Sequence, residues 1–269
     1  MKKLILIFLS IFIKSQEIII IDSLDHRPIS FCKIMDSDHL YVTDSLGKYN
    51  FATFPKESVI ISSAGYEVKK ITLKTGIVKL TPKFIQISEI NISNNNLKID
   101  TELGYKSSKN TIIIDQNREF AVEIKSQNAN CLIDNVSIPF KKSSSSKGYL
   151  LVDIYHDENG KIGEKINASN YVLAIEKLGK NNILQLIDEI YIEKGNAIYI
   201  SIIWVENTYT KSEKFANKIF LYTQPHKSSG KMFVRKSNYG DWDLKPYIEN
   251  VDQKNSIIPA LKIHGKCSK

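Results

Sequence analysis

Short apolar runs separated by turn residues recur along the first third of the chain. Glu17–Ile21 and Ile29–Met35 are apolar or β-branched, and clusters of Asp, Ser, Gly and Pro separate such runs. About seven strands at a spacing of roughly 8–12 residues predict a β-sandwich. We expect Thr43–Gly47 to close a hairpin, because Asp44 can accept a hydrogen bond from the backbone two residues on and Gly47 tolerates positive φ.

A second strand-rich region begins after residue 100. Glu119–Lys125 alternates between apolar and charged residues, and Ile198–Val205 is apolar on both faces, as in a central strand. The apolar residues of Ile183–Ile192 fit either a strand or a short helix. Residues 101–260 are therefore predicted to form a second, larger β-sandwich of jelly-roll type, and the expected fold class is all-β.

Residues 1–16 have the pattern of an export signal. Two lysines follow Met1, an apolar run extends from Leu4 to Ile13, and small or polar residues lie at Ser15 and Gln16. The run is about half of the ~20 residues that a membrane-spanning helix needs. A buried N-terminal helix is the alternative. With the signal removed, the remaining sequence predicts an exported protein without a transmembrane segment, in the periplasm, at the outer-membrane surface or in the medium.

The charge pattern gives little support to a nucleic-acid partner. The chain has 37 Lys and Arg against 29 Asp and Glu, but the excess is spread thinly along it. Its three arginines are Arg27, Arg118 and Arg235. Nucleic-acid surfaces usually cluster basic residues and use arginine to contact phosphates and bases.

The three cysteines, Cys32, Cys131 and Cys267, are too few and too scattered for a disulfide scaffold or a zinc site. One disulfide with one free thiol is compatible with an oxidising compartment. The alternative makes Cys32 and Cys131 small buried side chains and leaves Cys267 in a polar tail, residues 261–269.

An ordered series of short motifs in residues 17–92 resembles the carboxypeptidase regulatory-like domain. The motifs are Ile21-Asp22, Arg27-Pro28-Ile29, Thr43-Asp44 with Gly47 and Phe51, Ile61-Ser62 with Gly65-Tyr66, and Val78-Lys79-Leu80. This resemblance implies a transthyretin-like seven-stranded β-sandwich that serves as a folding and interaction module in exported proteins of Gram-negative bacteria. Residues 93–100 then read as a linker. The second half more loosely resembles uncharacterised C-terminal regions of such proteins.

Motifs for catalysis, metals and cofactors are missing from the sequence. None of the histidines has a Glu at the third following position, as a zinc carboxypeptidase site would need, and His156 with Glu158 has the wrong spacing. Serine-hydrolase, phosphate-loop and dinucleotide motifs are also missing. Asp157–Gly160 fits a hairpin turn better than a calcium loop. The sequence therefore predicts no catalytic residue, metal ligand or cofactor.

Trp242 and Tyr239 are the candidate ligand-binding residues, as an aromatic platform for a sugar. Asp241 and Asp243 flank Trp242 and would point together to the opposite side of a strand. The alternative is that Trp242 plugs one end of the sandwich.

These observations favour a non-enzymatic binding or assembly module of the cell envelope, with an envelope protein or a glycan as its partner. One alternative is a glycan-binding or glycan-hydrolysing protein that uses the second sandwich. Another is an accessory partner of a TonB-dependent uptake system.

Overall fold

The computed structural model describes residues 16–37, 39–51, 55, 58–83, 97–114, 118–141, 148–205, 219–224, 230–236, 239–244 and 258–268. Within these ranges the chain forms strands and one short 3₁₀ turn: β1 (Gln16–Asp22), β2 (Lys33–Met35), β3 (Leu40–Val42), β4 (Lys48–Phe51), β5 (Val59–Ser62), β6 (Lys69–Ile71), β7 (Gly76–Leu80), β8 (Leu97–Gly104), β9 (Thr111–Ile114), β10 (Arg118–Lys125), β11 (Cys131–Lys141), β12 (Tyr149–Glu158), β13 (Lys161–Lys165), β14 (Tyr171–Ala174), η2 (Ile175–Lys177), β15 (Asn181–Ile192), β16 (Ala197–Val205), β17 (Ile219–Tyr222), β18 (Met232–Lys236), β19 (Tyr239–Leu244) and β20 (Lys262–Ser268). The predicted all-β class is confirmed.

The N-terminal strands form two sheets that face each other. One sheet has the order β4-β1-β7 and the other β3-β2-β5-β6. Alternate residues of β1, including Ile18 and Ile20, point between the sheets and are fully buried with Ile34 and Ile61 of the other sheet. Burying such a side chain contributes roughly 1.5–3 kcal/mol, so this core accounts for the inward half of the apolar run in β1.

The second group of strands also packs as two sheets. One has the order β13-β12-β16-β10-β18-β19, with β14 beside β12, and the other β8-β20-β11-β17-β9, with β15 beside β11. Their shared core includes Ile154, Ile200, Val122 and the fully buried Trp204. β16 is buried along its whole length, which confirms the prediction of a central strand.

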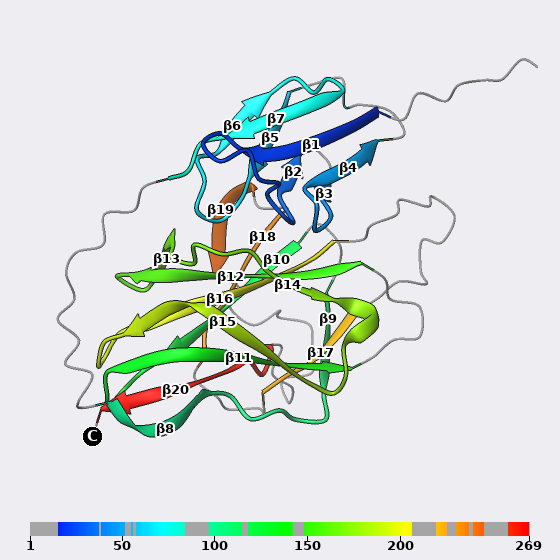
Figure 1. Cartoon of the computed structure of the whole chain (residues 1–269). Coiled ribbons are helices and arrows are strands. Elements are labelled where there is room, and N and C mark those ends of the chain that lie inside the picture. Colours follow the sequence, from blue (N-terminus) through cyan, green and yellow to red (C-terminus); the bar gives the residue numbers. More distant parts are fainter. Residues whose placement is uncertain are drawn as a thin grey trace, which may run out of the picture.

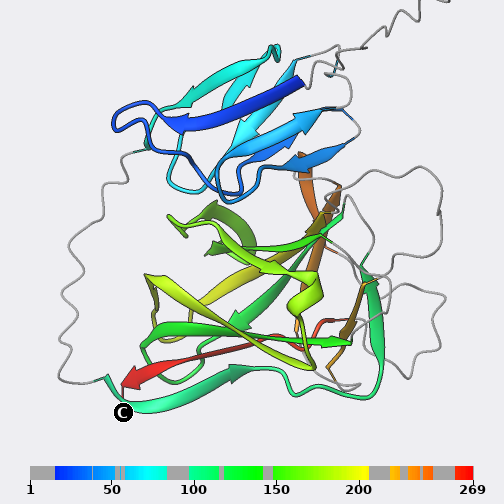
Figure 2. The same ribbon diagram turned by 45° about the vertical axis from the view of Figure 1, so that its right-hand side comes forward.

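The two sandwiches are stacked on each other, so that four sheets follow in layers (Figures 1 and 2). In the β3-β2-β5-β6 sheet, β2, β3 and β5 are mostly apolar on both faces, because their residues alternate between the core of the first sandwich and the second sandwich. Met35, Leu40 and Val42 pack against residues of the second sandwich, which include Leu151 and Ile203.

The end of the chain corrects a prediction. Residues 261–269 were expected to be a polar tail, but β20 lies between β8 and β11 inside a sheet. Only every second residue of β20 points inward, and the inward residues are Ile263, Gly265 and Cys267. Because lysine and histidine occupy the outward positions, the strand reads as polar.

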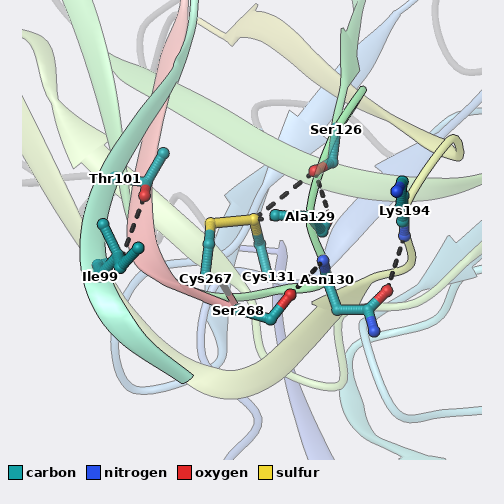
Figure 3. The surroundings of a disulfide bond; sticks show 9 residues. All are labelled: Ile99, Thr101, Ser126, Ala129, Asn130, Cys131, Lys194, Cys267 and Ser268. Carbon is teal, nitrogen blue, oxygen red and sulfur yellow. Dashed lines mark hydrogen bonds between the residues drawn. A yellow bond between two sulfur atoms is a disulfide. The ribbon is translucent and has the colours of Figure 1, made fainter. Parts of the chain in front are cut away.

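Cys267 forms a disulfide with Cys131 of β11 (Figure 3). The two residues are direct partners in the antiparallel ladder, and their Cα atoms are 4.1 Å apart. The alternative of two unpaired residues at these positions is therefore wrong, and the disulfide with one free thiol is observed. Cys32 is free and fully buried, and its burial raises the pKa of its thiol to about 12.

Two further expectations about local structure have clear outcomes. The ambiguous run Ile183–Ile192 is a strand, part of β15. Asp44 does accept a hydrogen bond from the backbone of Leu46, and Gly47 has φ 68°, but the turn leads from one sheet to the other instead of closing a hairpin within one sheet. A Cβ at Gly47 would lie 2.6 Å from the carbonyl oxygen of Ile20, so the crossing needs glycine.

The expected linker at 93–100 ends in strand, because β8 begins at Leu97 and pairs with β20. The export signal was predicted at residues 1–16. Residues 1–15 lie outside the described residues, and its last position, Gln16, is the first residue of β1. Among the residues that the structure describes, no helix has the length and apolar character to cross a membrane.

Candidate functional site

The densest group of buried polar side chains lies on one face of the β12-β16-β10-β18-β19 sheet. Along β10, Phe120 and Val122 point into the core of the second sandwich, whereas Glu119 and Ala121 point to the opposite face. Asp153 and Ser201 also lie on this outer face, and both are almost fully buried. Part of the face is covered by the N-terminal sandwich through Leu151 and Ile203.

Glu119 is the centre of the first polar cluster and is fully buried. Its Oε1 accepts hydrogen bonds from the hydroxyl of Ser201 at 2.6 Å and from that of Tyr155 at 3.2 Å. Its Oε2 accepts from Nε of Arg235 at 2.7 Å, and Nη2 of the same guanidinium lies at 2.7 Å. Glu119 and Arg235 are direct partners in the β10–β18 ladder, which sets up this two-pronged contact.

The cluster shifts the acid–base behaviour of its members. Burial lowers the pKa of Arg235, but Glu119, Tyr155 and Asp153 together outweigh burial, and the net shift of this pKa is upward. Burial, reinforced by the negative charges of Glu119 and Asp153, raises the pKa of Tyr155 well above its usual value. Both oxygens of Glu119 are occupied by donors from within the protein, so this carboxylate holds strands together and is not open to a substrate.

Trp242, a candidate ligand-binding residue, lies at the edge of this cluster. The Cζ atom of Arg235 lies 4.2 Å from the centre of the Trp242 ring, in a cation–π arrangement. The same ring meets that of Tyr155 edge-on, with centroids 5.7 Å apart. Trp242 is half-buried, and the flanking Asp241 and Asp243 are exposed.

The other candidate, Tyr239, begins β19, where its backbone pairs with Lys236. Its side chain is outside the described residues. The aromatic platform therefore stays a prediction, whereas the contact of Trp242 with Arg235 and Tyr155 is an observation.

A second polar cluster joins the two sandwiches. Lys33 of β2 extends to Asp153 of β12, with Nζ and Oδ2 2.5 Å apart, and Lys165 lies 3.6 Å from Oδ1. Asn167 donates to Asp153 as well, at 3.4 Å. Burial alone would raise the pKa of Asp153, but Lys165, Lys33 and the amide together lower it below its usual range.

Asn170 adds a neutral link beside this cluster. Its Oδ1 accepts from the backbone N–H of Ala64 at 3.0 Å, and its Nδ2 donates to the carbonyl of Ser30 at 2.9 Å and to the hydroxyl of Ser63 at 2.7 Å. One side chain of the second sandwich thus ties three residues of the first. Together with the ion pairs, it joins the sandwiches by directional contacts as well as apolar ones.

A pocket of about 740 Å³ opens at the seam between the sandwiches. Phe31 of the first sandwich and Tyr149 of the second line it and meet edge-on at 5.3 Å. Glu176, Lys177 and Asn181 supply polar groups on its other side. Phe31 has φ 55°, a conformation that costs energy in a bulky residue.

The remaining sequence candidates do not converge on a site. His156 and Glu158 are both exposed, and within the described ranges no group of three or more His, Cys, Asp or Glu side chains is placed to hold a metal ion. The hairpin turn predicted at Asp157–Gly160 is present: Asn159 and Gly160, both with positive φ, form the two-residue turn between β12 and β13. The Asp157 carboxylate accepts from Gly160 N–H and from the Tyr199 hydroxyl, both at 2.9 Å.

Sequence reasoning missed the roles of Glu119 and Asp153. An Asp in the middle of an otherwise apolar run, Tyr149–Tyr155, was a signal that a charge is buried and paired. Glu119 gave no such signal, because it stands at a polar position of an alternating strand.

Comparison with protein-family models, with curated proteins and with solved structures found no match.

Proposed function

We propose that this protein is an exported binding or assembly module of the cell envelope, which acts as a rigid two-sandwich scaffold and not as an enzyme. The observation that carries the proposal is the polar joint between the sandwiches. Lys33, Asp153 and Asn170 hold the two units in one orientation, over an apolar contact. A scaffold gains from such a joint, because surfaces on both units then meet a partner in a defined arrangement.

The Cys131–Cys267 disulfide supports export. Structural disulfides persist in oxidising compartments and are rare in the cytosol. This bond lies inside a sheet, and both of its cysteines belong to the buried core of the second sandwich.

The two buried carboxylates support a binding role over a catalytic one. Glu119 and Asp153 are held by internal partners. A catalytic acid or base needs a free position toward a substrate, and these carboxylates have their oxygens directed at donors within the protein.

Export is tested by trapping thiols in intact Gram-negative cells that produce the full chain. When the cells are quenched with acid and the protein is then unfolded in the presence of an alkylating reagent, one cysteine, Cys32, should be modified, because Cys131 and Cys267 are paired. The protein should also fractionate with the envelope. A matched chain without residues 1–16 should stay reduced in the cytosol. A reduced full-length protein in the cytosol would contradict the proposal.

Binding is tested by photo-crosslinking in the same cells. A photoreactive residue replaces Ile77 or Ile187, which are 64% and 78% exposed on the two sandwiches, and the buried Ile154 serves as the control position. A discrete adduct from an exposed position supports a binding role. The absence of adducts from both exposed positions would count against it.

A further inference from the structure

One edge of the second sandwich is a strand whose first half carries no charge. β15 lies beside β11 (Figure 1), and no described strand pairs with it on its other side. Residues 181–187 contain no charged residue, proline or glycine. Ile183 and Ile187 on this strand are 66% and 78% exposed. An open, apolar and uncharged strand edge is typical of a site that pairs with another chain.

The other edge strands of the described sheets have features that prevent such pairing. β3, β4, β6, β9 and β14 are only three or four residues long. The longer edge strands, β7, β8, β13 and β19, each carry lysine, aspartate or glutamate. Short edge strands and charged side chains are common protections against pairing with another chain. The first half of β15 lacks both.

The ladder with β11 determines which backbone groups of β15 face outward. Asn181 stands opposite Pro139. In the neighbouring pair, the N–H of Phe140 donates to the carbonyl of Lys180 at 3.2 Å. Opposite residues in an antiparallel ladder alternate between pairs that exchange hydrogen bonds and pairs that do not, so Asn181 exchanges none with β11. By the same alternation, the backbone N–H and C=O groups that point away from β11 are those of Asn181, Ile183 and Gln185.

The space outside this edge is open, and a bulge limits its length. The pocket at the seam is bordered by residues 181–183 of β15 and residues 172–174 of β14. Beyond Gln185 the ladder with β11 is interrupted. There the N–H of Asp188 donates to the hydroxyl of Tyr171 at 3.0 Å, which ties the bulge to β14. A second strand therefore has room beside the part of β15 that precedes the bulge.

We infer that two copies of this chain pair through β15, antiparallel about a two-fold axis at Ile183. Each Ile183 then lies opposite Ile183 of the partner subunit, and Asn181 lies opposite Gln185 of the partner subunit. In this register every outward residue exchanges both backbone hydrogen bonds with the residue opposite it. Isoleucine packs against isoleucine, uncharged amides face each other, and no like charges are opposed. The axis uses both open edges, so the dimer is closed.

Charges at the two ends of the paired segment favour the antiparallel arrangement. Those on the turn before β15 and on the adjoining end of β11 are Glu176, Lys177, Lys180 and Lys141. Those on the bulge of β15 and on the β11 residues beside it are Asp134, Asp188 and Glu189. The first end is net positive and the second is net negative. Antiparallel copies place opposite charges near each other, whereas parallel copies would place like charges together.

A second copy is the occupant that these observations favour, because the segment matches itself in hydrogen bonds, side chains and charge. A peptide from another protein would use the same backbone groups without this match. Pairing over so short a segment should bury less than the roughly 1,000 Å² of a stable interface, so we expect a weak dimer. This inference goes beyond the proposed function and does not depend on export.

Sedimentation velocity tests the dimer at protein concentrations from about 1 µM to 1 mM, the range of weak association. The protein used is the chain from Gln16 on, because the apolar run at Leu4–Ile13 would itself associate. It should change from monomer to dimer within this range.

Two matched variants locate the contact. Ile183→Lys opposes two lysines on the axis and should weaken dimerisation about tenfold or more, while its exposed position leaves the core intact. The control is Ile77→Lys, at a side chain that is 64% exposed on the edge strand β7. It should leave the dissociation constant within about twofold.

Cysteine variants in a Cys32→Ala background test the register. Cα atoms of residues that exchange hydrogen bonds are about 5.5 Å apart, which suits a disulfide, so Ile183→Cys should form a linked dimer under mild oxidation. Gln185→Cys alone should not, because its copy is displaced by about 13 Å along the strand. A mixture of Asn181→Cys and Gln185→Cys proteins should link.

A monomer at every concentration would overturn the inference. So would equal effects of Ile183→Lys and Ile77→Lys, which would place the contact elsewhere, or linked dimers from Gln185→Cys with none from Ile183→Cys. Open-ended oligomers that Ile183→Lys abolishes would rule out the closed two-fold arrangement. A photo-crosslink from Ile187 to a second copy would support this dimer and not an envelope partner, so the two proposals can fail separately.

Discussion

Lys33 and Asp153 form an ion pair between the two sandwiches, with Nζ and Oδ2 2.5 Å apart and side chains only 7% and 5% exposed. They are 120 residues apart in the chain. A buried pair of this kind adds little net stability compared with apolar residues, because both charges lose their hydration. The pair instead favours one orientation of the two sandwiches, because any other orientation would leave one charge buried without a partner.

Removing the side chain of Asp153 should therefore lower the free energy of unfolding more than removing that of Lys33. Asp153→Ala leaves Lys33 and Lys165 without their shared carboxylate, and we expect the free energy of unfolding to fall by about 3–5 kcal/mol. Lys33→Met leaves Asp153 paired with Lys165 and should cost clearly less. Urea unfolding measures both.

The exposed pair of Lys262 and Glu102 provides the control for that comparison. Its side chains are 26% and 46% exposed, so Glu102→Gln should cost less than about 1 kcal/mol. Equal losses in the free energy of unfolding for Asp153→Ala and Glu102→Gln would show that the buried ion pair matters no more to stability than the exposed pair.

The same carboxylate predicts a dependence on pH. The pKa of Asp153 is lowered in the folded protein, so its contribution is present above the unfolded pKa of about 3.9 and is lost as the pH falls through the folded value. The stability difference between the native protein and Asp153→Asn should be constant from about pH 7 to pH 5 and should shrink below about pH 4. Urea midpoints at a series of pH values measure it, and a difference that is still undiminished well below pH 4 would contradict the assignment.

The distribution of apolar residues was enough to predict much of the fold. β10 was predicted from alternation, β1 and β16 were predicted from apolar runs, and the turn within Asp157–Gly160 was predicted from its composition. β20 was not predicted, because its inward residues are Ile263, Gly265 and Cys267, of which only one is strongly apolar. The transthyretin-like and jelly-roll assignments stay predictions.

The polar clusters could not be predicted, because they depend on what covers a sheet. Glu119 and Lys33 stand at positions that alternation assigns to solvent, and only the stacking of the sandwiches and the register of β10 with β18 bury and pair them. The candidate Trp242 was found because it stands between two carboxylates, those of Asp241 and Asp243. Its partner Arg235 belongs to the next strand, and nothing local indicates their contact.

The disulfide should dominate stability under oxidising conditions. Cys131 and Cys267 are separated by 136 residues, and closing so long a loop lowers the entropy of the unfolded chain by an amount worth about 4–5 kcal/mol. Reductant should lower the melting temperature of the native protein and of Cys32→Ala alike. It should have no effect on the variant with Cys131→Ser and Cys267→Ser, and an effect there would assign the redox sensitivity elsewhere.

Trp242 provides the last test, because its two possible roles predict different results. If the ring serves mainly to cover the Arg235 guanidinium, Trp242→Ala should lower the free energy of unfolding by about 1–2 kcal/mol and leave retention on a glycan array unchanged. The loss should shrink in an Arg235→Met background, since the two side chains would no longer interact. A sugar platform predicts the reverse pattern, with lost glycan retention and the same stability cost in both backgrounds. The 4.2 Å contact between Cζ of Arg235 and the ring favours the first result, because it already occupies one face that a sugar would stack on.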